Sequence, residues 1–301
     1  MSAVVAADPR LVVEELAATR PPSLVRAVLR SAEGRVGLVL GVLMLLLATV
    51  GRLLAPYSPT AINAGPSLAG PSSAHLLGCD DLGRDVFSRF LYGGGTVLLV
   101  PLAAVTVALV IGVALGLFSA YRGGTTDAVI TRLFDVLLVI PPLLIALVLI
   151  AGLGTAGGVV ILTVALVYIP RLGRLARGAA RDVVTRDWVV AAELRGESPA
   201  WILRKEVLPS ITGTVLSSYA LYLTYGIIFV ATLSFLGAGA QPPSSDWGLM
   251  VAQSRAFISF NAWATIVPAL GIAAMSVAFT LLADAVNRQL ARGTDRAGMG
   301  I

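Results

Sequence analysis

Two long apolar stretches without a charged side chain constrain this chain more than any other feature. Residues 136–170 contain no Asp, Glu, Lys or Arg, and residues 207–245 contain none either. Of the 301 residues, 57% are hydrophobic and only 13% are charged. A soluble domain has about 25% charged residues, so this chain cannot cover a globule with polar groups. The sequence therefore predicts an all-α membrane protein whose helices are surrounded by lipid.

Six segments are apolar enough to cross a membrane, which takes about 20 residues per helix. The third contains the pair Pro141-Pro142, and the fourth is short. The predicted spans are residues 36–54, a helix within 90–121, 128–151, 157–172, a helix within 211–236, and 262–283.

The distribution of arginines predicts the orientation, because cytoplasmic segments of membrane proteins carry an excess of basic residues. If both termini are cytoplasmic, all but four of the 22 basic residues lie inside; the exceptions are Arg52, Arg84, Arg89 and Arg255. We therefore expect a multi-pass membrane protein with both termini in the cytoplasm. Its parts would be cytoplasmic tails at 1–35 and 288–301, a first helix at 36–54, an external loop at 55–92 and a five-helix core at 93–287.

Residues 171–209 form a charged segment between the two apolar stretches, and this orientation places it in the cytoplasm. Arg171, Arg174, Arg177 and Arg181 recur at helical spacing and continue the fourth span. Arginines at such a helix end can simply bind anionic lipid headgroups, and that alternative stays open. The segment as a whole is typical of a docking surface for another cytoplasmic protein.

The chain contains no recognisable chemistry of its own. A nucleotide-binding loop needs glycines before a lysine, and the only lysine, Lys205, follows no glycine turn. One histidine, His75, and one cysteine, Cys79, cannot form a metal cluster alone or an internal disulfide. We expect no catalytic residue, no metal and no cofactor, and the scattered basic residues disfavour a nucleic-acid partner.

Ion-coupled transport by this chain alone is also disfavoured, because carriers usually place ionisable groups near the membrane midplane. Only Asp135 and Asp284 come near a span. Their spacing from Arg132 and Arg288 predicts ion pairs along one helix face. Energy is therefore expected to enter through the charged segment, from another chain.

The middle of the charged segment predicts a short helix, a bend at Gly196 and a second short helix. Ala191 and Ala192 would let a partner approach the backbone closely, and Leu208-Pro209 would start the fifth span, since proline is tolerated in the first turn of a helix.

Three motifs resemble those of a known family, the permease subunits of binding-protein-dependent ABC importers. Residues 190–196 with Leu208-Pro209 resemble that family's EAA loop. Residues 75–89 (HLLGCDDLGRDVFSR) and 233–248 (LSFLGAGAQPPSSDWG) are similar to signatures of the C-type permeases of its dipeptide/oligopeptide/nickel group. The resemblance covers nearly the whole chain.

The resemblance implies a type I ABC importer permease fold with a cytoplasmic coupling helix in residues 171–209. The implied partners are a homologous B-type permease, two ABC ATPases that hold ATP and Mg²⁺, an external substrate-binding protein and membrane lipid. The implied cargo is a dipeptide or oligopeptide, and the alternative cargo is nickel chelate, glutathione or another small solute. A stand-alone secondary transporter is a less favoured alternative for the class of protein. The implied ATPase-coupling residues are Val190, Ala191, Ala192, Glu193, Arg195, Gly196, Leu208 and Pro209.

One departure from the family stands in this loop, because Val190 replaces the glutamate of the EAA motif. We hypothesise that Glu193 and Arg195 supply partner-specific contacts instead.

On the outer side, residues 80–92 predict an interfacial helix with Phe87, Phe90 and Leu91 on one face. His75 is expected to be a loop residue, and Trp247 is expected to lie at the membrane interface. The candidates for an external gate or pathway are Asp85, Phe235, Gly237 and Gly239, the glycines because they allow close backbone approach.

Overall fold

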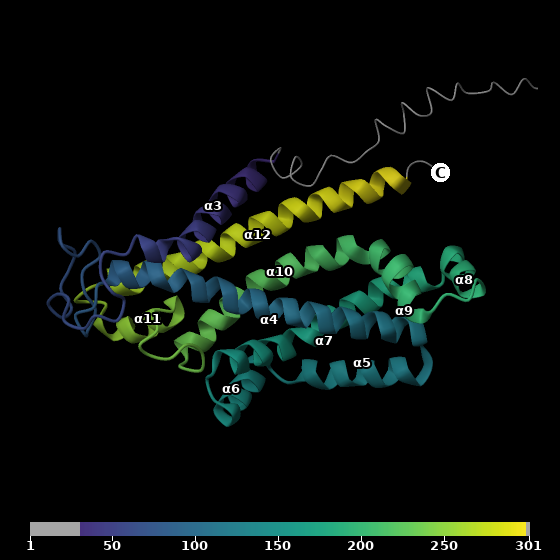
Figure 1. Cartoon of the computed structure of the whole chain (residues 1–301), viewed down its shortest axis with the longest axis horizontal. Coiled ribbons are helices and arrows are strands. Elements are labelled where there is room, and N and C mark those ends of the chain that lie inside the picture. Colours follow the sequence, from purple (N-terminus) through teal and green to yellow (C-terminus); the bar gives the residue numbers. More distant parts are fainter. Residues whose placement is uncertain (1–30, 299–301) are drawn as a thin grey trace, which may run out of the picture.

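A computed structural model describes residues 31–298. Long helices run side by side in an elongated bundle, with a loop region at one end and short helices at the other (Figure 1). The helices are α3 (Ala32–Thr49), α4 (Val86–Arg122), α5 (Gly124–Val139), α6 (Pro142–Leu153), α7 (Gly157–Val184), α8 (Asp187–Leu194), α9 (Pro199–Ile202), α10 (Leu208–Phe235), α11 (Trp247–Ser254) and α12 (Trp263–Gly298), with short turns η1 (Gly51–Leu53), η2 (Leu203–Val207) and η3 (Arg255–Phe257).

Five helices in the described part of the chain are long and apolar enough to cross a membrane: α3, α4, α7, the α9–α10 run and α12. A sixth span exists if α5 and α6 are counted together, and these two helices meet at an angle of 88°. Ile140 and Pro141 have extended backbones at the bend, because a residue before proline is disfavoured in the helical region. The all-helical fold class is confirmed, and the predicted interruption of the third span is a sharp bend.

Several predicted boundaries differ from the structure. α3 begins at Ala32 and ends at Thr49, so the first span lies closer to the N-terminus than 36–54. α7 continues past the predicted span end at Leu172 to Val184, which confirms that the helically spaced arginines continue the fourth span. The interfacial helix at 80–92 is wrong: residues 80–85 are turns and bends, and α4 begins at Val86 and continues without a break to Arg122.

The closest helix contact joins α4 to α7 through glycines. A Cβ atom at Gly116 would lie 2.3 Å from the carbonyl oxygen of Gly173, and one at Gly112 would lie 2.7 Å from that of Ile169. Side chains larger than hydrogen therefore cannot be accommodated without moving backbone. Small residues at such contacts let the backbones of membrane helices pack against each other. In lipid the hydrophobic effect does not drive helices together, so dispersion attraction at such close contacts stabilises the pair.

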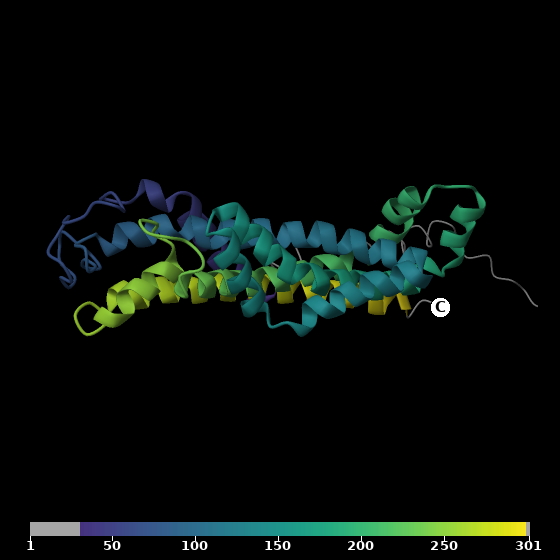
Figure 2. The ribbon, with the colours of Figure 1, turned by 90° about the horizontal axis from the view of Figure 1, so that it is seen from below.

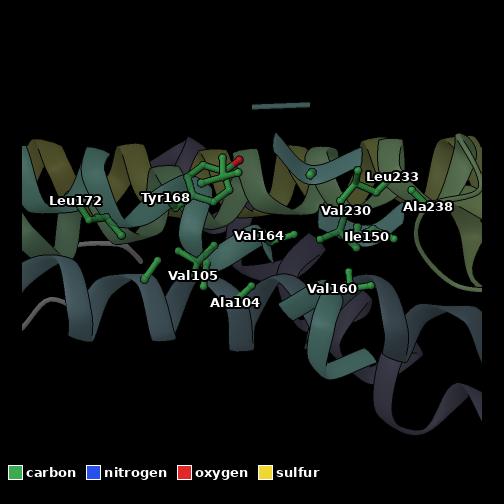
Figure 3. Close-up of a cluster of buried hydrophobic side chains, with 14 residues drawn as sticks. Ala104, Val105, Ile150, Val160, Val164, Tyr168, Leu172, Val230, Leu233 and Ala238 are labelled. Carbon is green, nitrogen blue, oxygen red and sulfur yellow. The ribbon is translucent and has the colours of Figure 1, made fainter. Parts of the chain in front are cut away.

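A buried apolar cluster extends this contact to the other helices (Figure 3). Ala104 and Val105 of α4 and Ile150 of α6 pack in it with side chains of α7 and α10. The α7 and α10 members are Val160, Val164, Ala165, Val167, Tyr168, Leu172, Val230 and Leu233. Four helices are held together here.

We expect Gly116→Ala to destabilise the protein. Overpacking costs roughly 1–3 kcal/mol, against about 1 kcal/mol gained from better helix propensity. The matched control is Gly178→Ala on α7, where an added Cβ meets nothing within 4 Å. The thermal unfolding midpoint in detergent should fall for Gly116→Ala and hold or rise for Gly178→Ala; equal midpoints would contradict the backbone contact.

Candidate docking surface and the opposite loop region

The α8–α9 segment, residues 185–207, stands at the end of the bundle opposite the long loop of residues 54–85 (Figure 2). α8 is followed by Gly196, whose φ of +80° is the left-handed conformation that glycine adopts without strain. Ser198 then caps α9 by accepting a hydrogen bond from the Trp201 amide at 3.3 Å. The predicted helix, glycine bend and second helix are confirmed, and the turn η2 leads directly into α10.

One face of the α8–α9 segment is fixed to the bundle. Val189, Ala192 and Ile202 are fully buried, together with Val207 of η2. They belong to one apolar cluster with α4, α7 and α10, whose members there are Val113, Leu117, Ala176, Ala180, Ile211 and Val215. Ala192 therefore serves the packing of the segment rather than an exposed contact. Leu208 packs partly buried against the same cluster.

The other face of α8 is apolar and exposed. Leu194 is 84% exposed, Trp188 48% and Val190 43%. Ala191, Glu193, Arg195 and Gly196 are exposed beside them, and Pro209 is exposed at the start of α10. A seated helix with an uncovered apolar face is typical of a protein interface. The structure thus brings most of the predicted coupling residues onto one surface.

The charges next to this segment pair between helices and not along them. Arg177 of α7 donates to both carboxylate oxygens of Asp127 on α5, and the Ser119 hydroxyl of α4 donates to the same carboxylate. Arg174 pairs with Asp135. The predicted Arg132–Asp135 pair is therefore wrong, because α7 packs against α5 and offers Asp135 a partner there.

The same correction applies to the sixth span. Arg288 pairs with Glu33 of α3, so the predicted pair with Asp284 is wrong. α3 lies across α12, which brings the two side chains together (Figure 1).

At the opposite end, the long loop is anchored by one amide. The Asn261 side chain donates to the carbonyl oxygens of Ala69, Leu77 and Cys79 at 3.0–3.3 Å. Cys79 is buried, and burial raises the pKa of its thiol, with further increases from the carboxylates of Asp85 and Asp80. The loop lacks helices and strands, as predicted, yet its backbone is held in place.

Asp85 caps α4, with a carboxylate oxygen accepting from the Ser88 amide at 2.8 Å. Its other oxygen lies 2.9 Å from Nδ1 of His75, and both side chains are buried. His75 is a loop residue, as predicted, with a structural partner. The structure gives Asp85 a capping contact, and its role at an external gate stays a prediction.

The arginines of this region, Arg84 and Arg89, are buried. Arg84 pairs with Asp80 at 2.7 Å, while Arg89 donates to Gln253 and to the Ser244 carbonyl. Arg89 thereby joins α4 to α11 and to the loop before it.

The glycines after α10 play different parts. Gly239 is close-packed, since a Cβ there would lie 2.3 Å from the Ser234 hydroxyl oxygen. Gly237 has open space around it and is required for its φ of +79°. The expectation that Gly237 allows a close approach between backbones is therefore wrong. The Phe235 ring lies 4.9 Å from the Arg255 guanidinium, and the pathway role of these residues stays a prediction.

Trp247 is fully buried, so its predicted position at the membrane interface is wrong. Its indole N–H donates to the Phe90 carbonyl at 2.8 Å, and its ring stacks on Phe90. Gly93 and Gly271 leave the space it occupies, as a Cβ at either would lie within 3 Å of the indole. The preceding Asp246 caps α11, and burial raises the pKa of its carboxyl.

The sequence reasoning missed Asn261 and Gln253. Their partners lie on segments far away in the chain, so spacing along the sequence carries no signal for them.

This architecture, a bundle of membrane-crossing helices with a seated short helix at one end, defines a multi-pass permease subunit. Residues 112–296 match the family described as the inner membrane component of binding-protein-dependent transport systems. The chain belongs to this family, and its type I ABC permease fold and inner-membrane location follow.

Similar proteins cover most of the chain. It is 34% identical over 255 residues to the dipeptide transport system permease protein DppC of Alkalihalophilus pseudofirmus, covering 85% of this chain and 84% of that protein. It is 37% identical over 249 residues to the probable D,D-dipeptide permease DdpC of Escherichia coli, covering 83% and 84%. It is 37% identical over 221 residues to the glutathione permease GsiD of Pectobacterium atrosepticum, covering 73% of each chain.

We expect Asn261→Ala to loosen the long loop, because three carbonyl groups lose their donor at about 0.5–1.5 kcal/mol each. The readout is maleimide modification of Cys79, the only cysteine in the chain. Its rate should rise about tenfold or more. The control is Gln241→Ala, whose amide bonds only carbonyls within its own turn. An unreactive Cys79 in Asn261→Ala would refute the anchoring.

Proposed function

We propose that this chain is the C-type permease of an ATP-driven peptide importer, with the α8–α9 segment as its coupling element. It pairs with a homologous B-type permease to form the pathway. Two ABC ATPases bind in the cytoplasm, one at the α8–α9 segment of this chain and one at the coupling loop of the B-type permease. An external substrate-binding protein delivers cargo at the long loop. Both termini lie in the cytoplasm, as the arginine distribution favours.

The observation that carries this proposal is the exposed apolar face of α8 on a buried base. Movement of a partner against Leu194 and Trp188 is transmitted to the bundle, because Val189 and Ala192 are packed without exposure against α4 and α7. A loosely attached helix would absorb such a movement. The energy for transport is supplied by the partners, and this chain contributes binding surface and pathway.

The peptide cargo is supported by the relatives, of which several are described as dipeptide permeases. The glutathione permease among them favours glutathione as the second candidate. Stimulation of ATP hydrolysis by the reconstituted complex with its binding protein, measured for dipeptides, glutathione and nickel chelates, decides between them. No stimulation by any peptide would overturn the peptide proposal.

We expect Leu194→Asp to weaken ATPase binding, because it places a charge in the centre of an apolar interface. Side chains at the centre of an interface typically contribute about 2 kcal/mol or more, about a thirtyfold loss of affinity. The measurement is recovery of the ATPase subunits with affinity-purified permease. Ile62→Asp, at another exposed apolar position on the long loop, is the control. Equal recovery for both variants would exclude α8 as the docking site.

The charges beside this face are expected to select the partner. Reversing both, as Glu193→Arg with Arg195→Glu, should reduce ATPase recovery and binding-protein-stimulated hydrolysis several-fold, about 1 kcal/mol for exposed pairs. The double reversal leaves the net charge unchanged, and Arg52→Glu, exposed at the other end of the chain, controls for charge reversal elsewhere on the surface. Unchanged stimulation of ATP hydrolysis in the double variant would contradict the selection of the partner by these charges.

A further inference from the structure

α7 and α10 share a face with polar side chains, and this face takes no part in the proposed docking of the ATPase. Tyr168 of α7 and Tyr222 of α10 have ring centroids 5.7 Å apart, and Tyr222 and Tyr225 are 6.2 Å apart. The Arg171 guanidinium lies 5.6 Å from the centre of the Tyr168 ring. We call these four residues the tyrosine–arginine face. Tyr225 is half exposed and Tyr222 and Arg171 are partly exposed, so a molecule outside this chain can reach them.

Arg171 lies near the cytoplasmic end of the fourth predicted span, residues 157–172. Arg171 is about 21 Å along the helix axis from Gly157, at about 1.5 Å per residue, in a span that crosses about 30 Å of hydrocarbon. Its Nη1 donates to the Val167 carbonyl at 2.6 Å, one turn back towards Gly157. The side chain is therefore directed into the span and away from the nearer helix end, the opposite of an arginine that extends to the headgroups.

Arg171 also differs from its neighbours in pairing. Arg174 and Arg177 pair with Asp135 and Asp127 of α5. Among residues 31–298, no carboxylate forms an ion pair with Arg171. An unpaired charge at this depth is costly, and such residues in membrane proteins face a water-filled cavity and mark a substrate path. The counter-ion is thus expected to come from outside the described residues.

The free donors fit a carboxylate. A guanidinium presents its N–H groups in a planar fork that binds both oxygens of a carboxylate. With Nη1 engaged by Val167, the remaining N–H groups are available, and the hydroxyl groups of Tyr222 and Tyr225 are further donors on the same face. The tyrosine rings add flat apolar surface next to the charge.

We propose that the tyrosine–arginine face binds the α-carboxylate of a peptide as it crosses the membrane, and that Arg171 makes transport selective for a free C-terminus. This inference rests on the proposed peptide import. A lipid phosphate has the same oxyanion chemistry, but it lies at headgroup level, whereas the guanidinium is directed into the span.

The test compares the dipeptide Ala-Phe with its C-terminal amide in the full complex reconstituted in phosphatidylcholine vesicles. Wild type should import the free acid, and Arg171→Gln should lose about 10- to 100-fold in kcat/KM for the acid with little change for the amide. Arg171→Lys keeps the charge without the fork and should lose less. Arg174→Gln, the same change on the paired neighbour, is the control and should keep the wild-type preference.

A second readout does not involve the binding protein. The thermal unfolding midpoint of the purified complex, in phosphatidylcholine nanodiscs with millimolar peptide, should rise with the acid and not with the amide. This rise should be absent in Arg171→Gln. Repeating it with phosphatidylglycerol, whose phosphate is not neutralised by a choline cation, tests an anionic headgroup as the counter-ion.

The outcomes separate the two proposals. No uptake of Ala-Phe or any other peptide by wild type overturns peptide import and this inference with it. Two outcomes overturn the carboxylate site alone. In the first, wild type imports the peptide, and Arg171→Gln lowers kcat/KM equally for the acid and the amide. In the second, the free acid still raises the unfolding midpoint of Arg171→Gln. The carboxylate site is also overturned if phosphatidylglycerol raises the unfolding midpoint of wild type but not of Arg171→Gln, and the peptide has no effect. That result would assign the tyrosine–arginine face to lipid binding.

Discussion

The backbone contact between α4 and α7 is the constraint on which the rest of the structure depends. Because Gly112, Gly116 and Gly173 have no side chains, α7 follows α4 closely towards its C-terminal end. Ala176 and Ala180 then meet Val113 and Leu117, and together they form the base on which α8 and α9 are seated. A wider helix separation would leave this base open, and the exposed face of α8 would have no fixed position relative to the bundle.

The second organising feature is that charges pair between helices. Asp127, Ser119 and Arg177 join α5, α4 and α7 next to the glycine contact, and Glu33 with Arg288 joins α3 to α12. Each pair satisfies charges that would otherwise be costly near lipid. After this pairing, the guanidinium of Arg171 has no carboxylate partner among residues 31–298, and the apolar face of α8 is uncovered. Both are surfaces that another molecule completes, which is what a subunit of a larger transporter requires.

Sequence reasoning succeeded where the signal is local and failed where it depends on a distant neighbour. Hydropathy located the spans, and Gly196 between two short polar-flanked segments predicted the α8–α9 segment, because both depend on residues within a few positions. Trp247 was placed at the interface from its residue type, yet Gly93 and Gly271 form the space that buries it. Asn261, Arg89 and the partners of Asp135 and Arg288 were missed or misassigned for the same reason.

The sequence by itself determined the number and order of apolar helices, the charged segment between two uncharged stretches, and the absence of a nucleotide loop with the only lysine at Lys205. Those properties rest on composition and short-range pattern. Only the tertiary structure decided which face of α8 is buried, which acid each arginine meets, and that Arg171 meets none within the described residues. The physical reason is that ion pairs and packed faces are set by the distance between helices, and here glycines far apart in the chain set that distance.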